Sequence, residues 1–217
     1  MSSSLLITGA SGTIGTELVK QLQARDTNFA VMSSKPGAIV AGQTTVFGDF
    51  ADPASLRAAF AGVHTLFLLF PFTPQSIDLA RNAVEAAKAS GVEHIVRSSG
   101  AGAEAGSPVA IASLQGRIDA LIENSGIPYT LLRPASFMQN WVTYYASQIK
   151  DGHYAGANGD AGISVVDVRD IAEAGRHRAD PPRRLRRQGL HAYRRRGLEH
   201  WRAGGIDCPS HRATSAL

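Results

Sequence analysis

Glycine spacing near the amino terminus predicts phosphate chemistry. The stretch "LLITGASGTIGTELVKQLQ" places glycines at positions 9, 12 and 15, between an apolar run typical of a strand and a segment typical of a helix. Glycine permits a tight turn at Gly9, lets the backbone approach a pyrophosphate at Gly12, and allows close helix–strand packing at Gly15. The free N–H groups at the start of the helix attract a phosphate, and the hydroxyls of Ser11 and Thr13 can donate to it. We therefore predict a dinucleotide site formed by Gly9, Ala10, Ser11, Gly12, Thr13, Ile14 and Gly15.

The end of the second strand-like run bears on the choice of dinucleotide. An acidic residue there would bind a ribose 2′-hydroxyl, whereas a cation would bind a 2′-phosphate. The sequence "VMSSKPGA" contains no acid and offers Ser33, Ser34 and Lys35. We therefore predict NADPH as the cofactor and expect NADH to be less favoured. The alternative is that Lys35 is a solvated loop lysine that binds no ligand.

Six apolar runs alternate with helix-like segments along the first 170 residues. They are "LLITG", "FAVMS", "TTVFG", "TLFLLF", "HIVRSS" and "YTLLRP". Continuous hydrophobicity is typical of strands that are buried on both faces. The β-α-β order predicts an α/β protein with an NAD(P)-binding Rossmann fold, in which helices cover both faces of a parallel sheet. This order favours the dinucleotide site over a turn with only a structural role, because the glycine motif stands at the first strand-to-helix junction.

Net charge divides the chain into two unlike parts. Residues 1–175 contain 11 Lys+Arg and 15 Asp+Glu, a net charge of −4, whereas residues 176–217 contain 11 arginines and 3 acids, a net charge of +8. We expect a Rossmann domain over residues 1–175 and an irregular Arg-rich tail over residues 176–217. The acidic larger part argues against a specific nucleic-acid partner. One cysteine, with no leader and no long apolar run, predicts a cytoplasmic protein that does not enter a membrane.

Three ordered motifs carry a resemblance to a known family. "TGASGTIG", "VFGDFADPASLRAAFAGVHTLFLLFP" and "SGIPYTLLRPASFMQNW" together resemble the NmrA-like group of atypical short-chain dehydrogenases/reductases, over about residues 4–173. The resemblance implies an NAD(P)H-dependent oxidoreductase that passes hydride to a quinone, an azo dye or a triphenylmethane dye. Another branch of the family binds NADP without turnover and acts as a redox-sensing regulator, and this function remains the alternative. The resemblance leaves open whether the protein is a monomer or a dimer.

The resemblance also implies roles for residues beyond the glycine motif. Asp49 and Phe50 of "GDF" would border the adenine, and Phe70 of "LLFPF" would line the path of the ribose and nicotinamide. Asp49 and Asp52 have a second interpretation as turn or N-cap residues before "PASLRAAF", and capping suits Asp52 better. The turn that covers the nicotinamide in relatives would be formed here by Ser136, Phe137, Met138, Gln139 and Asn140, with Asn140 bonding the carboxamide.

Acid–base residues for hydride transfer are sparse in this chain. Short-chain dehydrogenases activate a carbonyl oxygen with a Tyr-xxx-Lys pair, but the segment "SSGAGAEAGSPVAIASLQGRIDALIENSG" contains neither residue type. The remaining candidates for contact with a substrate are Ser98, Gln115 and Asn140. Interconversion of alcohols and ketones is therefore disfavoured. A small electron-poor aromatic acceptor, which needs less help from an acid, is favoured as the substrate.

Aromatic and apolar residues follow the sixth strand-like run at helical spacing. They can form a wall for a flat aromatic substrate, and core packing is the alternative. The residues are Phe137, Met138, Trp141, Tyr144 and Tyr145.

The Arg-rich tail has two interpretations. Residues 176–217 consist largely of Arg, Ala, Gly, Pro and His, and they lack both helical and strand periodicity. This composition is typical of an alternative frame of a GC-rich gene, so we favour a change of reading frame, or a sequencing error, just after Ala174. The rival is a genuine basic arm, because arginines contact phosphates. The four histidines of the tail and Cys208 lack the spacing of zinc ligands, and we predict no metal site.

Overall fold

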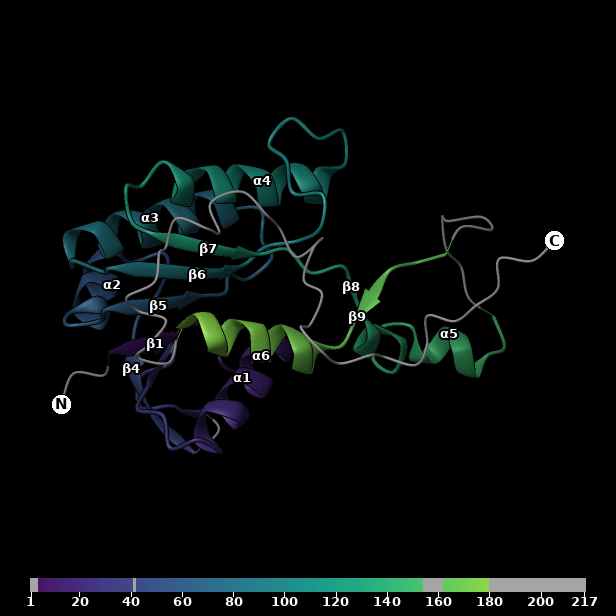
Figure 1. Cartoon of the computed structure of the whole chain (residues 1–217), viewed down its shortest axis with the longest axis horizontal. Coiled ribbons are helices and arrows are strands. Elements are labelled where there is room, and N and C mark those ends of the chain that lie inside the picture. The colour runs from purple at the N-terminus through teal and green to yellow at the C-terminus, as the bar shows by residue number, and fades with distance from the viewer. Residues whose placement is uncertain (1–3, 41, 154–161, 180–217) are drawn as a thin grey trace.

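The computed structural model describes residues 4–40, 42–153 and 162–179 (Figure 1). Its centre is a seven-stranded sheet in the order β3-β4-β2-β1-β5-β6-β7. Neighbouring strands are parallel, except that β3 at the edge is antiparallel to β4. The strands are β1 (Leu5–Ile7), β2 (Ala30–Ser33), β3 (Ile39–Val40), β4 (Gln43–Phe47), β5 (Thr65–Leu68), β6 (His94–Ser98) and β7 (Tyr129–Leu132). The six predicted strands are confirmed.

Helices cover both faces of the sheet, as Figure 1 shows. On one face lie α1 (Thr13–Gln23) and α6 (Val168–Ala179), which pack against each other. On the other face lie α2 (Pro53–Phe60), α3 (Ser76–Ala89) and α4 (Ala110–Glu123). This arrangement confirms the predicted Rossmann fold.

Alternating strand residues feed two separate cores. In β1, Leu5 and Ile7 join the core under α1 and α6, whereas Leu6 joins the core under α2 and α3. All three side chains are almost fully buried, which explains why the strands read as continuous apolar runs. On α1, Leu18 and Leu22 are one turn apart and are both buried against the sheet. The two cores fix the strand ends, from which the loops of the candidate site begin.

Helix α6 extends past the boundary that the charge pattern predicts. The sequence suggested that the domain ends at residue 175, but α6 continues to Ala179, and both Arg176 and Ala179 are buried. Gly175 permits this close packing, because a Cβ there would lie 2.5 Å from the Cε2 atom of Phe67. The first four residues of the predicted tail therefore pack with the domain. Residues 180–217 lie outside the described part of the chain.

A small second unit follows β7 and lies apart from the main sheet at one end of the molecule (Figure 1). It consists of β8 (Ser136–Phe137), a 3₁₀ helix η1 (Met138–Trp141), α5 (Ala146–Lys150) and β9 (Val165–Val166). Strands β8 and β9 pair in parallel. Its aromatic side chains contact one another, with ring centroids 5.6 Å apart for Trp141 and Tyr145 and 4.9 Å apart for Tyr144 and Tyr145. Trp141 and Tyr145 are half-buried and Tyr144 is exposed, whereas Phe137, also in the predicted wall, packs against the core under α1 and α6.

Candidate functional site

A cleft of about 800 Å³ runs along the carboxyl ends of β1, β2, β4, β5 and β6. The strand order reverses at β1, since the chain proceeds from β1 to β2 and β4 on one side and returns to β5, β6 and β7 on the other. Ligands of open α/β sheets bind outside the strand ends at such a switch point. The cleft is lined by these predicted site residues: Gly9, Ala10, Ser11, Gly12, Thr13, Ile14, Gly15, Ser34, Lys35, Asp49, Phe50, Phe70, Ser98, Gln115 and Phe137.

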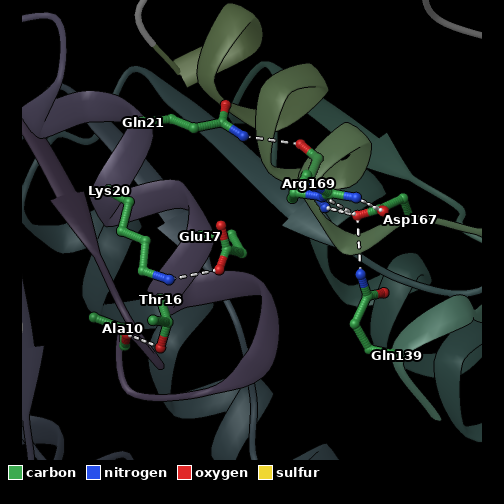
Figure 2. Close-up of polar contacts among 8 residues, drawn as sticks. All are labelled: Ala10, Thr16, Glu17, Lys20, Gln21, Gln139, Asp167 and Arg169. Atoms are coloured by element: carbon green, nitrogen blue, oxygen red, sulfur yellow. Dashed lines mark hydrogen bonds and ion pairs between the residues drawn. The ribbon is translucent and has the colours of Figure 1, made fainter. Parts of the chain in front are cut away.

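The glycine loop has no room for side chains at its two ends. Gly9 has a left-handed φ of 61°, and a Cβ at Gly15 would lie 2.2 Å from the carbonyl oxygen of Gly9. Thr16 holds the loop on α1, because its hydroxyl donates to the carbonyl of Ala10 at 3.4 Å (Figure 2). No side chain caps the start of α1, and its first turn has no acidic residue. The N–H of Gly12 donates to the carbonyl of Gly9 at 3.0 Å, so the N–H groups of residues 13–15 and the positive helix end remain available for a phosphate.

The turn after β2 supplies a cation at one end of the cleft. Ser33 shapes this turn, because its hydroxyl accepts a hydrogen bond from the backbone N–H of Lys35 at 3.0 Å. Ser34 and Lys35 are exposed and line the cleft. The Lys35 ammonium makes no ion pair within the described residues. It is therefore free to bind an anionic group of a ligand.

Two aromatic rings and two carboxylates follow β4 and β5. Phe50 and Phe70 lie with ring centroids 5.0 Å apart and planes inclined at 46°. Asp52 accepts from the backbone N–H of Ala54 at 2.9 Å, which confirms it as the N-cap of α2. Asp49 accepts from the backbone N–H of Ala51 at 2.9 Å and is half-buried at the cleft. Asp49 therefore has a local turn role and can still offer its second carboxylate oxygen to a ligand.

A buried polar network lies beneath the β6 end of the cleft. Arg97 of β6 is 2% exposed and donates to Asp119 and to the side-chain oxygen of Gln115, both on α4. Ser99 donates to the other oxygen of Asp119 at 2.8 Å, and an Nη atom of Arg133 lies 3.2 Å from it. Burial lowers the pKa of Arg97 to about 10, although the Asp119 carboxylate opposes this shift. The guanidinium therefore remains charged at neutral pH.

The sequence patterns singled out Gln115 and Ser98 but missed Arg97 and Asp119. An arginine inside the apolar run "HIVRSS" must find a carboxylate or remain a costly buried charge. Asp119 stands four residues after Gln115, so both lie on the same side of a helix. These two signals together could have predicted the network.

Four residues of the predicted nicotinamide turn do not line the cleft as the described residues form it: Ser136, Met138, Gln139 and Asn140. Gln139 has another role, because its amide nitrogen donates to Asp167 at 2.9 Å and its oxygen accepts from the backbone N–H of Val168 at 3.0 Å. It thereby ties the small unit to the start of α6 (Figure 2). Hydrogen bonds from Arg169 hold the pKa of Asp167 well below its usual range.

Metal-binding clusters and membrane-spanning helices are both absent from the part of the chain that the structure describes. No group of three or more His, Cys, Asp or Glu side chains there could hold a metal ion. No helix there is both long and apolar enough to cross a bilayer.

A family of proteins described as NAD(P)H-binding matches residues 9–174. The chain belongs to this NAD(P)H-binding family. The match begins at the first glycine of the loop and ends inside α6. It therefore covers every described residue that lines the cleft.

Two curated members with named reductase activities resemble the chain. The NAD(P)H azoreductase of Xenophilus azovorans is 34% identical over 172 residues, which are 77% of this chain and 60% of that protein. Quinone oxidoreductase 2 of Escherichia coli is 30% identical over 177 residues, which are 78% of this chain and 62% of that protein. The chain thus spans about three fifths of the length of these relatives.

Two solved structures of reductases also resemble the chain. The Escherichia coli NADPH-dependent quinone oxidoreductase complexed with NADPH has a TM-score of 0.73 at 28% identity, covering 82% of this chain and 65% of that one. The triphenylmethane reductase of Citrobacter sp. complexed with NADP(H) has a TM-score of 0.69 at 27% identity, covering 80% and 64%. The resemblance to quinone, azo-dye and triphenylmethane-dye reductases is therefore confirmed.

Proposed function

We propose that the protein is an NAD(P)H-dependent reductase that transfers hydride to a quinone-like, azo-like or dye-like aromatic acceptor. The observation that carries this proposal is one continuous cleft that joins the uncapped glycine loop of α1 to the polar end of β6. The first part suits a dinucleotide phosphate, and the second offers hydrogen-bond donors to a substrate. Names of relatives support the acceptor class, since they include an azoreductase and a quinone oxidoreductase.

The residues present fit a dinucleotide. The loop is closely packed, because a Cβ at Gly9 or Gly15 would lie 2.8 Å from Leu69 Cβ or 2.2 Å from Gly9 O, and the start of α1 beside it has no side-chain cap. The N–H groups of residues 13–15 would hold the pyrophosphate, since that of Gly12 donates to the carbonyl of Gly9 at 3.0 Å. Ser34 and Lys35 would hold a 2′-phosphate, and Asp49, Phe50 and Phe70 the adenosine end. When bound, NADPH supplies the hydride. Asn140 remains a candidate contact for the carboxamide. It does not line the cleft as described, so this contact would require the small unit to move toward the cleft.

The acceptor class follows from the acid–base residues. The stretch from Ser99 to Gly126 contains no Tyr-xxx-Lys pair, so a strong proton donor for a simple ketone is absent from it. An electron-poor π-system can accept hydride first and take its proton from water afterwards. Quinones and azo bonds meet this requirement, and a dye cation becomes neutral on taking up hydride and needs no proton at all.

A direct assay tests the proposal. Purified protein is mixed with NADPH and a panel of quinones and azo dyes, and cofactor oxidation is followed by absorbance. We expect turnover with at least one acceptor and none with simple ketones. NADPH binding without turnover across the panel would instead favour the alternative, a non-catalytic NADP-binding redox-sensing regulator. The missing Tyr-xxx-Lys pair is the observation that keeps this alternative open.

A further inference from the structure

Arg97, in the polar network beneath the cleft, has more hydrogen-bond donors than its partners can accept. The Nε atom of Arg97 is buried and has no hydrogen-bond partner within the described structure. Its carboxylate partner, Asp119, is shared with Arg133 at 3.2 Å. Glu123 lies 3.9 Å from Arg133 and is 42% exposed, so it balances Arg133 only weakly. A ligand atom that carries negative charge would therefore be stabilised beside this network.

Arg97 fixes the orientation of the Gln115 amide. A guanidinium has only hydrogen-bond donors, so the oxygen of Gln115, not its nitrogen, must face Arg97. The NH₂ group of Gln115 then points away from Arg97. It has no acceptor within the described residues, it is not a buried atom, and Gln115 lines the cleft. The cleft therefore contains a hydrogen-bond donor, the NH₂ group of Gln115, which is held in place because the oxygen of the same amide is bound to Arg97.

The helix that carries Gln115 is itself held in place. Ser99 donates to Asp119 at 2.8 Å, which ties the end of β6 to the next turn of α4. Gly116 lets α4 approach the preceding loop, because a Cβ there would lie 2.2 Å from the carbonyl carbon of Glu104. Small rotations of α4 that would turn the amide away from the cleft are therefore opposed by contacts on two sides.

We propose that the side-chain NH₂ of Gln115 is the hydrogen-bond donor to the acceptor atom that gains negative charge during reduction, and that Arg97 and Asp119 are its positioning residues. This proposal rests on the proposed reductase function. Gln115 would be a catalytic residue, because it touches the substrate. Arg97 and Asp119 would act through Gln115.

The charge balance of the reaction explains why such a donor is useful. An acceptor that takes up a hydride gains two electrons and one proton, while the reduced nicotinamide is oxidised. A quinone oxygen or an azo nitrogen then carries a negative charge until a proton from water neutralises it. A preorganised N–H group stabilises that charge as it forms, which lowers the barrier. The amide does not lose its own proton at any stage.

A cofactor-free measurement tests the donor directly. Para-nitrophenol resembles a reduced acceptor and absorbs visible light only as the anion, so its pKa when bound can be read by titration. We expect the wild-type protein to lower the pKa of the bound phenol. Gln115→Glu keeps a partner for Arg97 but replaces the donor with a carboxylate, and it should raise the pKa of the bound phenol. Asn124→Asp, which also replaces an amide with a carboxylate, at the exposed C-cap of α4, is the matched control and should have no effect.

Kinetics of the holoenzyme test the positioning. Removing one such donor typically lowers kcat by about 100-fold, and we expect this for Gln115→Met, with NADPH affinity changed by less than about twofold. Arg97→Lys keeps the charge beside Asp119 but loses the fork that holds Gln115, so it should also lower kcat. In the Gln115→Met background Arg97→Lys should cause no further loss, because its effect passes through Gln115. Thermal unfolding checks that each variant is folded.

The outcomes separate this proposal from the reductase proposal. A wild-type protein that does not lower the phenol pKa, or a Gln115→Glu variant that still lowers it, would overturn the donor. Additive losses in the double variant would overturn the positioning role of Arg97. A retained phenol effect without any NADPH turnover would refute the reductase function and leave the donor site standing.

Discussion

Gly15 lies where the glycine loop meets α1, and a Cβ there would be 2.2 Å from the carbonyl oxygen of Gly9. Gly15→Ala must therefore displace the loop, at a cost of about 1–3 kcal/mol in the free energy of unfolding. The displaced N–H groups would no longer converge on a phosphate. We expect NADPH affinity to fall by at least about tenfold, measured by fluorescence titration. Gly106→Ala is the control, because a Cβ there meets open space.

Lys35 decides the predicted preference for NADPH. Its exposed ammonium lines the cleft, and no acid stands in "VMSSKPGA" to favour NADH. Lys35→Ala should weaken NADPH binding by about tenfold, because a charge-assisted contact with the 2′-phosphate is lost. NADH binding by the same variant is the internal control and should not change. Equal losses for both cofactors would show that Lys35 acts on something common to them.

His94 makes stability depend on pH. Burial, together with the nearby Arg178 charge, lowers its pKa from 6.5 to about 4, and its Nε2 atom lies 3.1 Å from the Thr130 hydroxyl. Between these two pKa values the unfolded chain binds more protons than the folded chain, so stability is full above pH 6.5 and falls as the pH drops toward 4. The loss is on the order of 3 kcal/mol at most.

The His94 effect is isolated by substitution. His94→Gln retains a hydrogen-bonding group but does not titrate, so urea unfolding should lose less stability between pH 6.5 and 4 than the wild type does. His153→Gln, at an exposed histidine, should keep the wild-type slope. An unchanged slope in the His94 variant would assign the pH dependence to other groups.

How far the geometry of the predicted site residues could be read from the sequence depends on how local their contacts are. The glycine loop was predictable because its geometry depends on a few neighbouring residues. Arg97 and Asp119 meet across β6 and α4, 22 residues apart. Their signals were a charge inside an apolar run and a carboxylate on the same side of a helix as Gln115, and neither signal alone pairs the two residues. Gln139 was assigned to the cofactor because its neighbours resemble a known turn, yet its amide bonds to Asp167 and Val168, 28 and 29 residues away.

At the scale of elements, Gln139 joins the small unit to α6. Gln139→Ala removes two hydrogen bonds and leaves the Val168 N–H without that partner, so we expect a loss of about 1–3 kcal/mol of stability in urea unfolding. NADPH affinity should change by less than about twofold, because Gln139 does not line the cleft. Val142→Ala, 75% exposed in the same segment, is the control. A large loss of NADPH affinity would support the predicted role of Gln139 in the cofactor site.

The predictable elements are those long enough to show a pattern. The six parallel strands appeared as apolar runs, and four of them, β1, β2, β5 and β6, contribute buried side chains to the cores on both faces of the sheet. Strands β3, β8 and β9 contain two residues each, too few for any periodicity, and depend on partners elsewhere in the chain. The predicted domain boundary at residue 175 falls inside helix α6, whose last turn carries Arg176, His177 and Arg178. The burial of Arg176 among tertiary contacts overrides that local charge pattern.

At the scale of the whole molecule, the excess of positive charge and the binding site lie in different parts of the chain. Residues 1–179 contain 13 Lys+Arg and 15 Asp+Glu, a net charge of −2, whereas residues 180–217 contain 9 arginines and 3 acids, a net charge of +6. All described residues that line the cleft fall between Gly9 and Phe137. The family match ends at residue 174, at the position where we place a change of reading frame.

Deleting residues 180–217 tests whether the arginines serve the site. We expect the shortened chain to bind NADPH within about twofold of the full chain, because every described cleft residue is retained. Its net charge becomes −2, so retention on heparin should be lost at low salt, whereas the full chain, at +4, should be retained and then released as salt rises. Sequencing the gene across the codons for residues 170–180 decides the origin of the tail. If an intact single frame is found and the full chain binds one nucleic-acid sequence specifically at physiological salt, the tail is a genuine basic arm and the change of frame is refuted.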